Sequence, residues 1–354
     1  MSILDKIKKN STIKDSAILS QSKFFTKKDM IATSVPVINL ALSGRLDGGL
    51  TPGLTMWAGP SKHFKTAFSL LMAKSYMEKY PDAALLFYDS EFGTPQSYFD
   101  SFKIDMDRVL HTPLTDVEQL KFDIMQQLQN LERGDKLIIV VDSIGNLASK
   151  KEVEDALEGK GVADMSRAKQ IKSLFRMITP HLNLKDIPMI VVNHTYMEIG
   201  MFPKAIVGGG TGSYYSADNI FIIGRQQEKE GTEIVGYNFI INVEKSRYVK
   251  EKSKIPVSVS FDGGISKWSG LLDLALESGH VIKPSNGWYS KVNKETGEIE
   301  DKKYRIKDTD TKEFWMPILM DKTFNDWVRI NYQVASADII NDDDVAKALA
   351  ELDE

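Results

Sequence analysis

The sequence predicts an α/β fold with a mainly parallel central sheet and helices on both faces of that sheet. From about residue 54 to residue 261, short aliphatic runs alternate with longer amphipathic stretches. The runs are rich in β-branched residues and mostly lack polar alternation, which is typical of strands buried on both faces. With 354 residues, of which 42% are hydrophobic, the chain is long enough for about two domains.

Six runs are the expected strands, and the stretches between them are the expected helices. The helix at 115–133 has the clearest signals, because Thr115 and Glu118 match a capping box and Gly134 follows as a stop. One stripe of this helix is apolar and is expected to face the sheet. The stripe contains Val117, Leu120, Ile124, Leu128 and Leu131. The expected strands are 54–58, 83–88, 136–142, 187–193, 219–224 and 239–243.

The chain is expected to have three parts: an N-terminal segment (1–30), the α/β core (31–284) and a small α+β C-terminal domain with an acidic tail (285–354). Residues 1–28 carry seven lysines and two acids, whereas residues 335–354 carry seven acids and one lysine. This distribution fits a polyanion binder whose tail limits binding. A tail that only aids solubility is the alternative.

Several classes of chemistry are excluded by composition. The chain has no cysteine, so it has no disulfide, cysteine-bound zinc, iron–sulfur cluster or thiol nucleophile, and it suits a reducing compartment. The N-terminus has no apolar signal-peptide stretch, and the longest strictly aliphatic run, 137–141, is far shorter than the roughly 20 residues that span a bilayer. We therefore expect a cytoplasmic protein with no membrane partner.

A phosphate-loop motif lies between the first expected strand and the next helix. It follows G-x-x-x-x-G-K-[ST], except that Phe64 replaces the second glycine. Lys65 would bridge the β- and γ-phosphates of a nucleotide, and Thr66 would ligate Mg²⁺. A left-handed backbone at Phe64 would cost about 1 kcal/mol and requires a ring that points away from the phosphates. An ordinary strand-to-helix turn is the alternative. The motif contains Gly59, Pro60, Ser61, Lys62, His63, Phe64, Lys65 and Thr66.

Two acids follow expected strands. Asp142 ends the run at 136–142, where a carboxylate can hold Mg²⁺ beside a phosphate loop. Glu91 follows the run at 83–88 and is a candidate to polarise the attacking water, provided that the sheet brings these strand ends together. Taken singly, each also fits an ordinary strand end or a surface residue.

Further polar residues and two loops follow later strands. His194, at the tip of the strand at 187–193, could sense a γ-phosphate, although a structural histidine is the alternative. The glycine-rich stretch after it and the polar stretch at 150–165 are expected to be mobile loops. Basic residues nearby could hold a nucleic-acid backbone. They include Arg167, Lys172 and Arg176.

Lys245 and Arg247 follow the strand at 239–243 at positions i and i+2, so their side chains point the same way. Such a pair could reach a phosphate across a subunit boundary, as arginine fingers do. A solvated hairpin is the alternative.

Together and in this order, the motifs resemble those of the RecA-like homologous recombinases, and most closely the T-even phage branch of that family. The resemblance covers about residues 24–315 and lies in GPSKHFKT, LFYDSEFG, VVDSIGNLASKKE, VVNHTY, GGGTG and NVEKSR. It implies a RecA-like P-loop ATPase core and ATP-dependent DNA strand exchange with Mg²⁺. The implied partners are single-stranded DNA, homologous duplex DNA, further copies in a helical filament, and phage single-strand-binding and loader or mediator proteins.

The resemblance also implies roles for single residues. Glu91 falls where the family places its water-activating glutamate, and Tyr98 falls where a tyrosine stacks on adenine. His194 replaces the glutamine that couples the γ-phosphate to DNA in bacterial RecA. Lys245 and Arg247 match two basic residues that reach the neighbouring subunit's ATP.

Two stretches, 150–165 and 197–213, match the family's DNA-binding loops, and residues 1–30 match the segment that docks on the next protomer. Val162 and Phe202 stand where the family inserts apolar side chains between base triplets. The implied DNA-binding residues are Val162, Arg167, Lys172, Arg176, Met201, Phe202, Lys204, Gly208, Gly209, Gly210, Thr211 and Gly212.

Three other classes of protein stay open. A hexameric RecA-fold helicase usually carries a priming or linker domain, for which residues 1–30 are too short. A mediator that binds DNA and nucleotide without turnover is suggested by Phe64. A soluble α/β kinase would phosphorylate an acceptor and ignore DNA.

Overall fold

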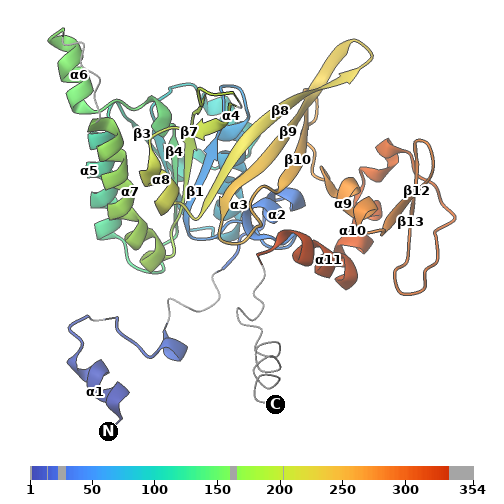
Figure 1. Ribbon diagram of the computed structural model, residues 1–354, viewed down its shortest axis with the longest axis horizontal. Helices are drawn as coiled ribbons and strands as arrows, with labels where there is room; N and C mark the ends of the chain where they lie inside the picture. The colour runs from blue at the N-terminus through green and yellow to red at the C-terminus, as the bar shows by residue number, and fades with distance from the viewer. Residues whose placement is uncertain (1, 14, 23–28, 160–165, 202, 335–354) are drawn as a thin grey trace, which may run out of the picture.

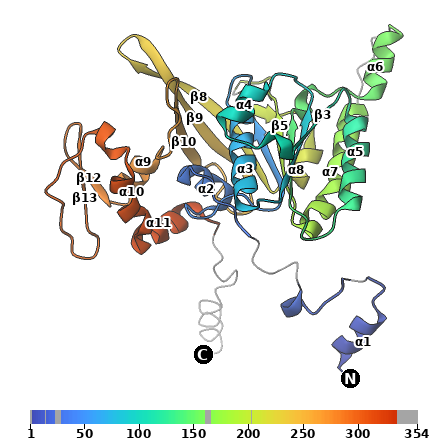
Figure 2. The same cartoon turned by 180° about the vertical axis from the view of Figure 1, so that it is seen from behind.

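The body of the protein is one nine-stranded sheet with helices on both faces (Figures 1 and 2). The structure is a computed structural model that describes residues 2–13, 15–22, 29–159, 166–201 and 203–334. Across the sheet the strands are β11 (Gly264–Ile265), β10 (Lys254–Ser260), β9 (Glu233–Ser246), β8 (Asn219–Glu230), β1 (Gly53–Ala58), β5 (Pro188–Asn193), β4 (Leu137–Asp142), β2 (Ala84–Asp89) and β3 (Val109–Pro113). Neighbours are parallel from β8 to β3 and antiparallel from β8 to β11. All six expected strands lie in this sheet, which confirms the α/β fold.

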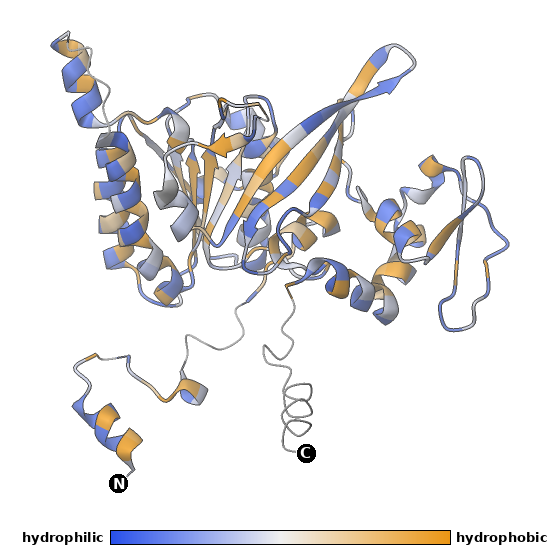
Figure 3. Ribbon diagram, in the orientation of Figure 1, coloured by the Kyte–Doolittle hydropathy of each residue, from blue (hydrophilic) through white to orange (hydrophobic). Residues whose placement is uncertain are grey.

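Each face of the sheet has its own core, because alternate residues of a strand point to opposite faces. On β4, Ile138 and Val140 belong to the apolar cluster on one face, and Ile139 and Val141 belong to the cluster on the other. Figure 3 shows orange stretches along the strands of the body, and helices around them in which blue and orange residues alternate. The helices of the first face include α2 (Pro36–Ser43) and α3 (Lys65–Lys79), and those of the second face include α5 (Val117–Asn130) and α7 (Ser166–Lys185).

β8 and β9 form a long hairpin whose outer half projects beyond the body (Figure 1). The two strands pair from Asn219 and Ser246 out to Glu230 and Glu233, and Gly231 in the turn has a left-handed φ of 63°. The sequence predicted only the inner parts of these strands, because the outer half of β8 is polar and exposed and Gly236 interrupts the apolar residues at the start of β9.

A small C-terminal unit buries Phe314, Trp315 and Phe324, which belong to the same apolar cluster as the first face of the sheet. The expected boundary at residue 285 falls inside the β12–β13 hairpin of this unit, so we propose that the unit begins before its first helix. The expected acidic tail, 335–354, lies outside the described residues. The elements of the unit are α9 (Leu271–Glu277), β12 (Val281–Ser285), β13 (Trp288–Lys291), α10 (Lys312–Met320) and α11 (Lys322–Tyr332).

The N-terminal helix α1 (Ile3–Asn10) lies apart from the body in Figure 1. Ser2 and Asp5 form a capping box at its start, and its apolar side chains Ile3 and Ile7 are 77% and 62% exposed. None of the helices within the described ranges is long and apolar enough to cross a membrane.

The start of α5 differs from the sequence prediction. The N-cap is Asp116 and not Thr115, because the Asp116 carboxylate accepts from Gln119 N at 2.8 Å. Glu118 does not close a capping box; its carboxylate accepts instead from Lys150 N at 3.1 Å. The helix also ends at Asn130, before the expected stop. The apolar stripe is confirmed, with Val117, Leu120, Ile124 and Leu128 buried against the sheet.

Asp116→Ala is therefore expected to lower the free energy of unfolding by about 1 kcal/mol, the usual effect of removing an N-cap. Urea unfolding followed by circular dichroism measures this as a lower midpoint at constant slope. Asp116→Asn, which keeps the cap acceptor, is the matched control. A midpoint shift for Thr115→Ala as large as that for Asp116→Ala would contradict the assignment.

Candidate nucleotide and DNA-binding site

Parallel pairing brings the expected site residues to one edge of the sheet. The carboxyl ends of parallel strands meet at the same edge, and the loop at 59–64 leaves β1 there to enter α3. Ala58 at the end of β1 lies opposite Asn193 at the end of β5, and Asp89 at the end of β2 lies opposite Asp142 at the end of β4. β5 separates β1 from β4, so the loop and the carboxylates lie on either side of the β5 tip.

The loop contains two left-handed residues that are not glycine. Lys62 and Phe64 both have a φ of 61°, which costs about 1 kcal/mol for a residue with a Cβ atom. The Phe64 ring stacks on Phe239 with centroids 5.1 Å apart and meets Phe68 edge-on at 5.9 Å. The bulky side chain at the glycine position is therefore half-buried and packs against the aromatic core.

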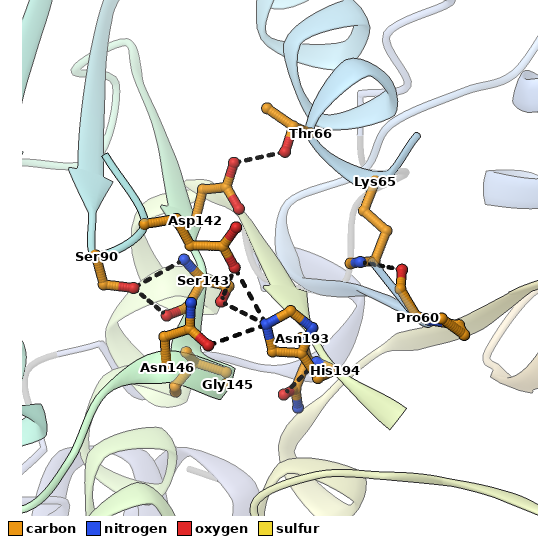
Figure 4. Close-up of polar contacts among 12 residues, drawn as sticks. Pro60, Lys65, Thr66, Ser90, Asp142, Ser143, Gly145, Asn146, Asn193 and His194 are labelled. Carbon is orange, nitrogen blue, oxygen red and sulfur yellow. Dashed lines mark hydrogen bonds and ion pairs between the residues drawn. The ribbon is translucent and has the colours of Figure 1, made fainter. Parts of the chain in front are cut away.

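Lys65 and Thr66 begin α3 beneath the loop (Figure 4). Lys65 is buried and its Nζ donates to Pro60 O at 2.7 Å; burial lowers the pKa of this amine. Thr66 Oγ1 donates to Asp142 Oδ2 at 2.6 Å, which brings the two expected Mg²⁺ ligands together.

The surroundings of Asp142 suit it to act as a ligand for a cation. Its second carboxylate oxygen, Oδ1, is buried and has no hydrogen-bond partner among the described residues. Burial raises the pKa of Asp142 to about 6, because a carboxylate out of water lacks compensating charge. Mg²⁺ is commonly held by one or two protein oxygens and by substrate phosphates, so Thr66 and Asp142 are a suitable donor set.

Glu91 is held through both its backbone and its carboxylate. Asp89 accepts from the backbone N–H groups of Glu91 (3.0 Å) and Phe92 (2.8 Å) and so shapes the turn. Ser143 Oγ donates to Glu91 Oε1 at 2.6 Å, and His194 Nε2 lies 3.1 Å from the same oxygen. The hydrogen bond from His194, followed by that from Ser143, lowers the pKa of Glu91, so its carboxylate is ionised at neutral pH. The sequence analysis did not predict Ser143, whose only signal was its position after Asp142.

His194 lies at the tip of β5 beside Gly145 and Asn146 (Figure 4), and it joins the nucleotide side of the site to the second expected DNA loop. Its Nε2 also lies 3.1 Å from Asn146 Oδ1, in the turn that leads to residue 150. Its backbone oxygen accepts from Gly208 N at 2.9 Å, and Asn193 Nδ2 donates to Gly208 O at 2.8 Å. Gly145 is required here, since a Cβ atom would lie 2.4 Å from the His194 ring.

A pocket of about 570 Å³ opens between this edge and the β8–β9 hairpin. Tyr98, from α4 (Gln96–Ser101), lines it together with Glu91, Asp142, His194 and the loop residues from Ser61 to Thr66. The opposite wall was not predicted and includes Arg225, Tyr237 and Phe261. Arg225 lies over the Tyr237 ring, 4.7 Å from its centroid, and donates to Lys62 O at 3.2 Å.

The first expected DNA loop contains a helix. Residues 150–157 form α6 (Lys150–Leu157), while Val162 lies outside the described residues. Arg167 at the start of α7 is half-buried, and its guanidinium donates to three backbone carbonyls, which holds it in place; its expected DNA contact stays a prediction. The acceptors are the oxygens of Ile144 (2.9 Å), Gly145 (2.9 Å) and Leu147 (2.6 Å).

The second expected loop contains a short hairpin of β6 (Thr195–Met197) and β7 (Ala205–Val207). Met201 and Lys204 are exposed there, and Phe202 lies outside the described residues. Ile199, which the sequence analysis did not single out, is also fully exposed. Apolar side chains presented in this way suit contact with unstacked bases.

Glycines at 208–212 lead from this hairpin into α8 (Thr211–Ser216). Gly209 and Gly210 have left-handed φ values of 89° and 75°. Gly212 packs against α7, where a Cβ atom would lie 2.6 Å from Lys172 Cβ. Lys172 and Arg176 are exposed on α7, so the outer side of this junction is basic.

Lys245 and Arg247 lie at the opposite edge of the sheet from the phosphate loop. Lys245 pairs with Ile220, near the start of β8, and its Nζ donates to Tyr214 O at 2.6 Å. Arg247 Nε lies 2.5 Å from Asp218 Oδ1. The two cations point toward one region, as predicted, and that region is remote from the loop of their own chain.

Comparison with known proteins agrees with this geometry. The family model of the RecA N-terminal domain matches residues 2–266, and the model of the C-terminal domain of the bacteriophage T4 recombination and repair protein matches residues 268–328. The recombination and repair protein of Enterobacteria phage T4 is 53% identical over 93% of this chain and 85% of its own length. Protein RecA of Arthrospira platensis is 27% identical over 85% of this chain and 80% of its own length. The chain belongs to the RecA family.

Proposed function

We propose that this protein is an ATP-dependent recombinase that polymerises on single-stranded DNA, searches a homologous duplex and exchanges strands. It would act in the cytoplasm of the bacterial host of a phage. The observation that carries the proposal is that His194 makes two contacts. Its ring contacts Glu91, and its backbone accepts a hydrogen bond from Gly208. One residue thereby touches both the catalytic carboxylate and the glycine stretch expected to bind DNA. The similarity to the phage T4 recombination and repair protein supports the same activity.

In the proposed hydrolysis, the backbone of the phosphate loop and Lys65 hold the β- and γ-phosphates of ATP, while Tyr98 packs on the base. Mg²⁺ held by Thr66 and Asp142 would neutralise phosphate charge. Glu91 accepts a proton from the attacking water, a role supported by its ionised state and by the two donors that fix its position. A nucleotide-binding mediator without turnover is less well supported, because the Phe64 ring packs on Phe239 and leaves Lys65 and Thr66 in place.

DNA would act on this site through the segments that flank His194. Binding at residues 197–213 moves or fixes Gly208, and the hydrogen bonds between Gly208, Asn193 and His194 pass that change to Glu91. Lys204, Lys172 and Arg176 would contact the DNA backbone, and exposed Met201 would contact bases.

Adjacent protomers would complete the site. Lys245 and Arg247 lie too far from their own loop to serve it, which supports a role at a neighbour's ATP. In the single chain, each cation is held by a local acceptor, Tyr214 O or Asp218, and is thereby kept in place for that contact. The exposed apolar face of α1 suits docking of residues 1–30 on the next protomer.

Lys65→Ala is expected to abolish strand exchange and ATP turnover, because the buried amine at the start of α3 supplies the positive charge that the motif places on the phosphates. Joint-molecule formation between single-stranded and homologous duplex DNA, measured together with phosphate release, tests this. Lys74→Ala, which removes a partly exposed lysine of the same helix, is the matched control. Near-normal phosphate release by Lys65→Ala would refute the phosphate-loop assignment, and wild-type protein that hydrolyses ATP without forming joint molecules would refute strand exchange.

Glu91→Gln should slow hydrolysis by about 10² or more while nucleotide and DNA binding persist, since an amide keeps the shape but cannot take the proton. Single-turnover hydrolysis and nucleotide titration measure the two effects separately. Glu78→Gln, on the surface of α3, serves as the control. If Glu91→Gln weakened ATP binding and left single-turnover hydrolysis intact, the role of Glu91 as base would be wrong.

A mixture of Lys245→Ala and Lys65→Ala protomers should recover part of the DNA-stimulated ATPase activity that each variant lacks alone. Some interfaces in the mixture join an intact phosphate loop to an intact cation pair. Lys65→Ala protomers mixed with the double variant Lys65→Ala/Lys245→Ala contain no such interface and should stay inactive. Normal co-assembly of the first mixture without any gain in activity would exclude the trans role.

A further inference from the structure

The β8–β9 hairpin contacts the phosphate loop at two points. The carbonyl of Lys62 accepts from Arg225 of β8, and the ring of Phe64 stacks on Phe239 of β9 at an interplanar angle of 24°. These are the two residues of the loop that adopt a left-handed backbone without being glycine. Each left-handed residue thus has its own partner on the hairpin.

The residues that make these two contacts also pack on each other and on the core. Arg225 lies over Tyr237, and Phe239 follows Tyr237 at a ring distance of 6.0 Å. Phe239 also meets Phe68 of α3 at 6.2 Å, and Phe68 lies 5.3 Å from Trp57 of β1. The rings therefore connect the loop to the strand before it, to the helix after it and to the hairpin opposite.

A glycine at position 64 would adopt the left-handed backbone unaided but would also leave it readily. Phenylalanine disfavours that backbone, so the loop keeps this shape only while its ring is held by neighbours. The shape matters because the loop's N–H groups must converge on the phosphates.

We propose that Phe64 is a positioning residue: its stacking on Phe239 fixes the phosphate loop in the nucleotide-binding shape that a glycine provides in the usual motif. The proposal rests on the proposed function only in that the loop binds nucleotide; it requires neither hydrolysis nor DNA. The contact acts before the nucleotide arrives, so its loss should weaken binding and leave the chemical step nearly unchanged.

Binding of MgADP measured by calorimetry is the direct test. Phe64→Gly, which restores the usual motif, should weaken MgADP binding about tenfold, because the loop must then be ordered by the ligand. Phe239→Leu should have a similar effect. The double variant should bind no more weakly than either single variant, since both remove one contact. Phe64→Tyr keeps the ring and should bind like the wild type, as should Phe122→Leu, an exposed phenylalanine on α5.

Steady-state kinetics separates positioning from general damage. For Phe64→Gly and Phe239→Leu, the KM for ATP should rise about tenfold, with kcat within about twofold of the wild type. Thermal unfolding monitors the fold, and Phe239→Leu alone carries the test if Phe64→Gly does not fold. Wild-type or tighter MgADP binding by Phe64→Gly, or additive losses in the double variant, would overturn the proposal. Absence of strand exchange by the wild type would refute only the proposed function, because MgADP binding is measured without DNA.

Discussion

The parallel pairing of β1, β5, β4 and β2 is the constraint on which the whole site depends. Residues far apart in the chain reach one edge because parallel strands all end there. The register sets the details: Asp142 lies opposite Asp89, which shapes the turn of Glu91, and Asn193 lies opposite the last residue before the phosphate loop. A slip of one residue would turn each of these side chains to the wrong face.

The pKa values of two carboxylates at this edge are shifted in opposite directions by their surroundings. Asp142 is buried with one oxygen unpartnered, which raises its pKa to about 6 and makes a cation favourable there. Glu91 receives hydrogen bonds from His194 and Ser143, which lower its pKa and keep it able to accept a proton. Their environments therefore suit Asp142 to binding a cation and Glu91 to accepting a proton.

Much of the core site was predictable because its signals are local. A strand, a spaced loop motif and an acid at a strand end are each visible within about ten residues of sequence. The N-cap of α5 was misplaced by one residue because Thr115 and Asp116 are both good caps, and the pairing of Asp116 with Ala148, distant in sequence, favours the second. The three backbone carbonyls that accept from Arg167 were not visible in the sequence, because they lie about 20 residues before it and are brought close only by the fold. The β9 partner of Phe64, Phe239, was likewise not visible in the sequence, since only the tertiary fold brings the hairpin over the loop.

The phosphate loop and the cation pair lie at opposite edges of one sheet, so any contact that joins them between protomers unites two different surfaces. Such a head-to-tail contact gives a polymer with a direction and two unlike ends. If Lys245 and Arg247 act as proposed, the protomer at one end has a nucleotide site without the cations of a neighbour. The protomer at the other end has a cation pair that contacts no neighbouring nucleotide. Short polymers would then be less active per protomer than long ones, and growth or loss at one end would create or remove a working site without any change in the protomers that remain.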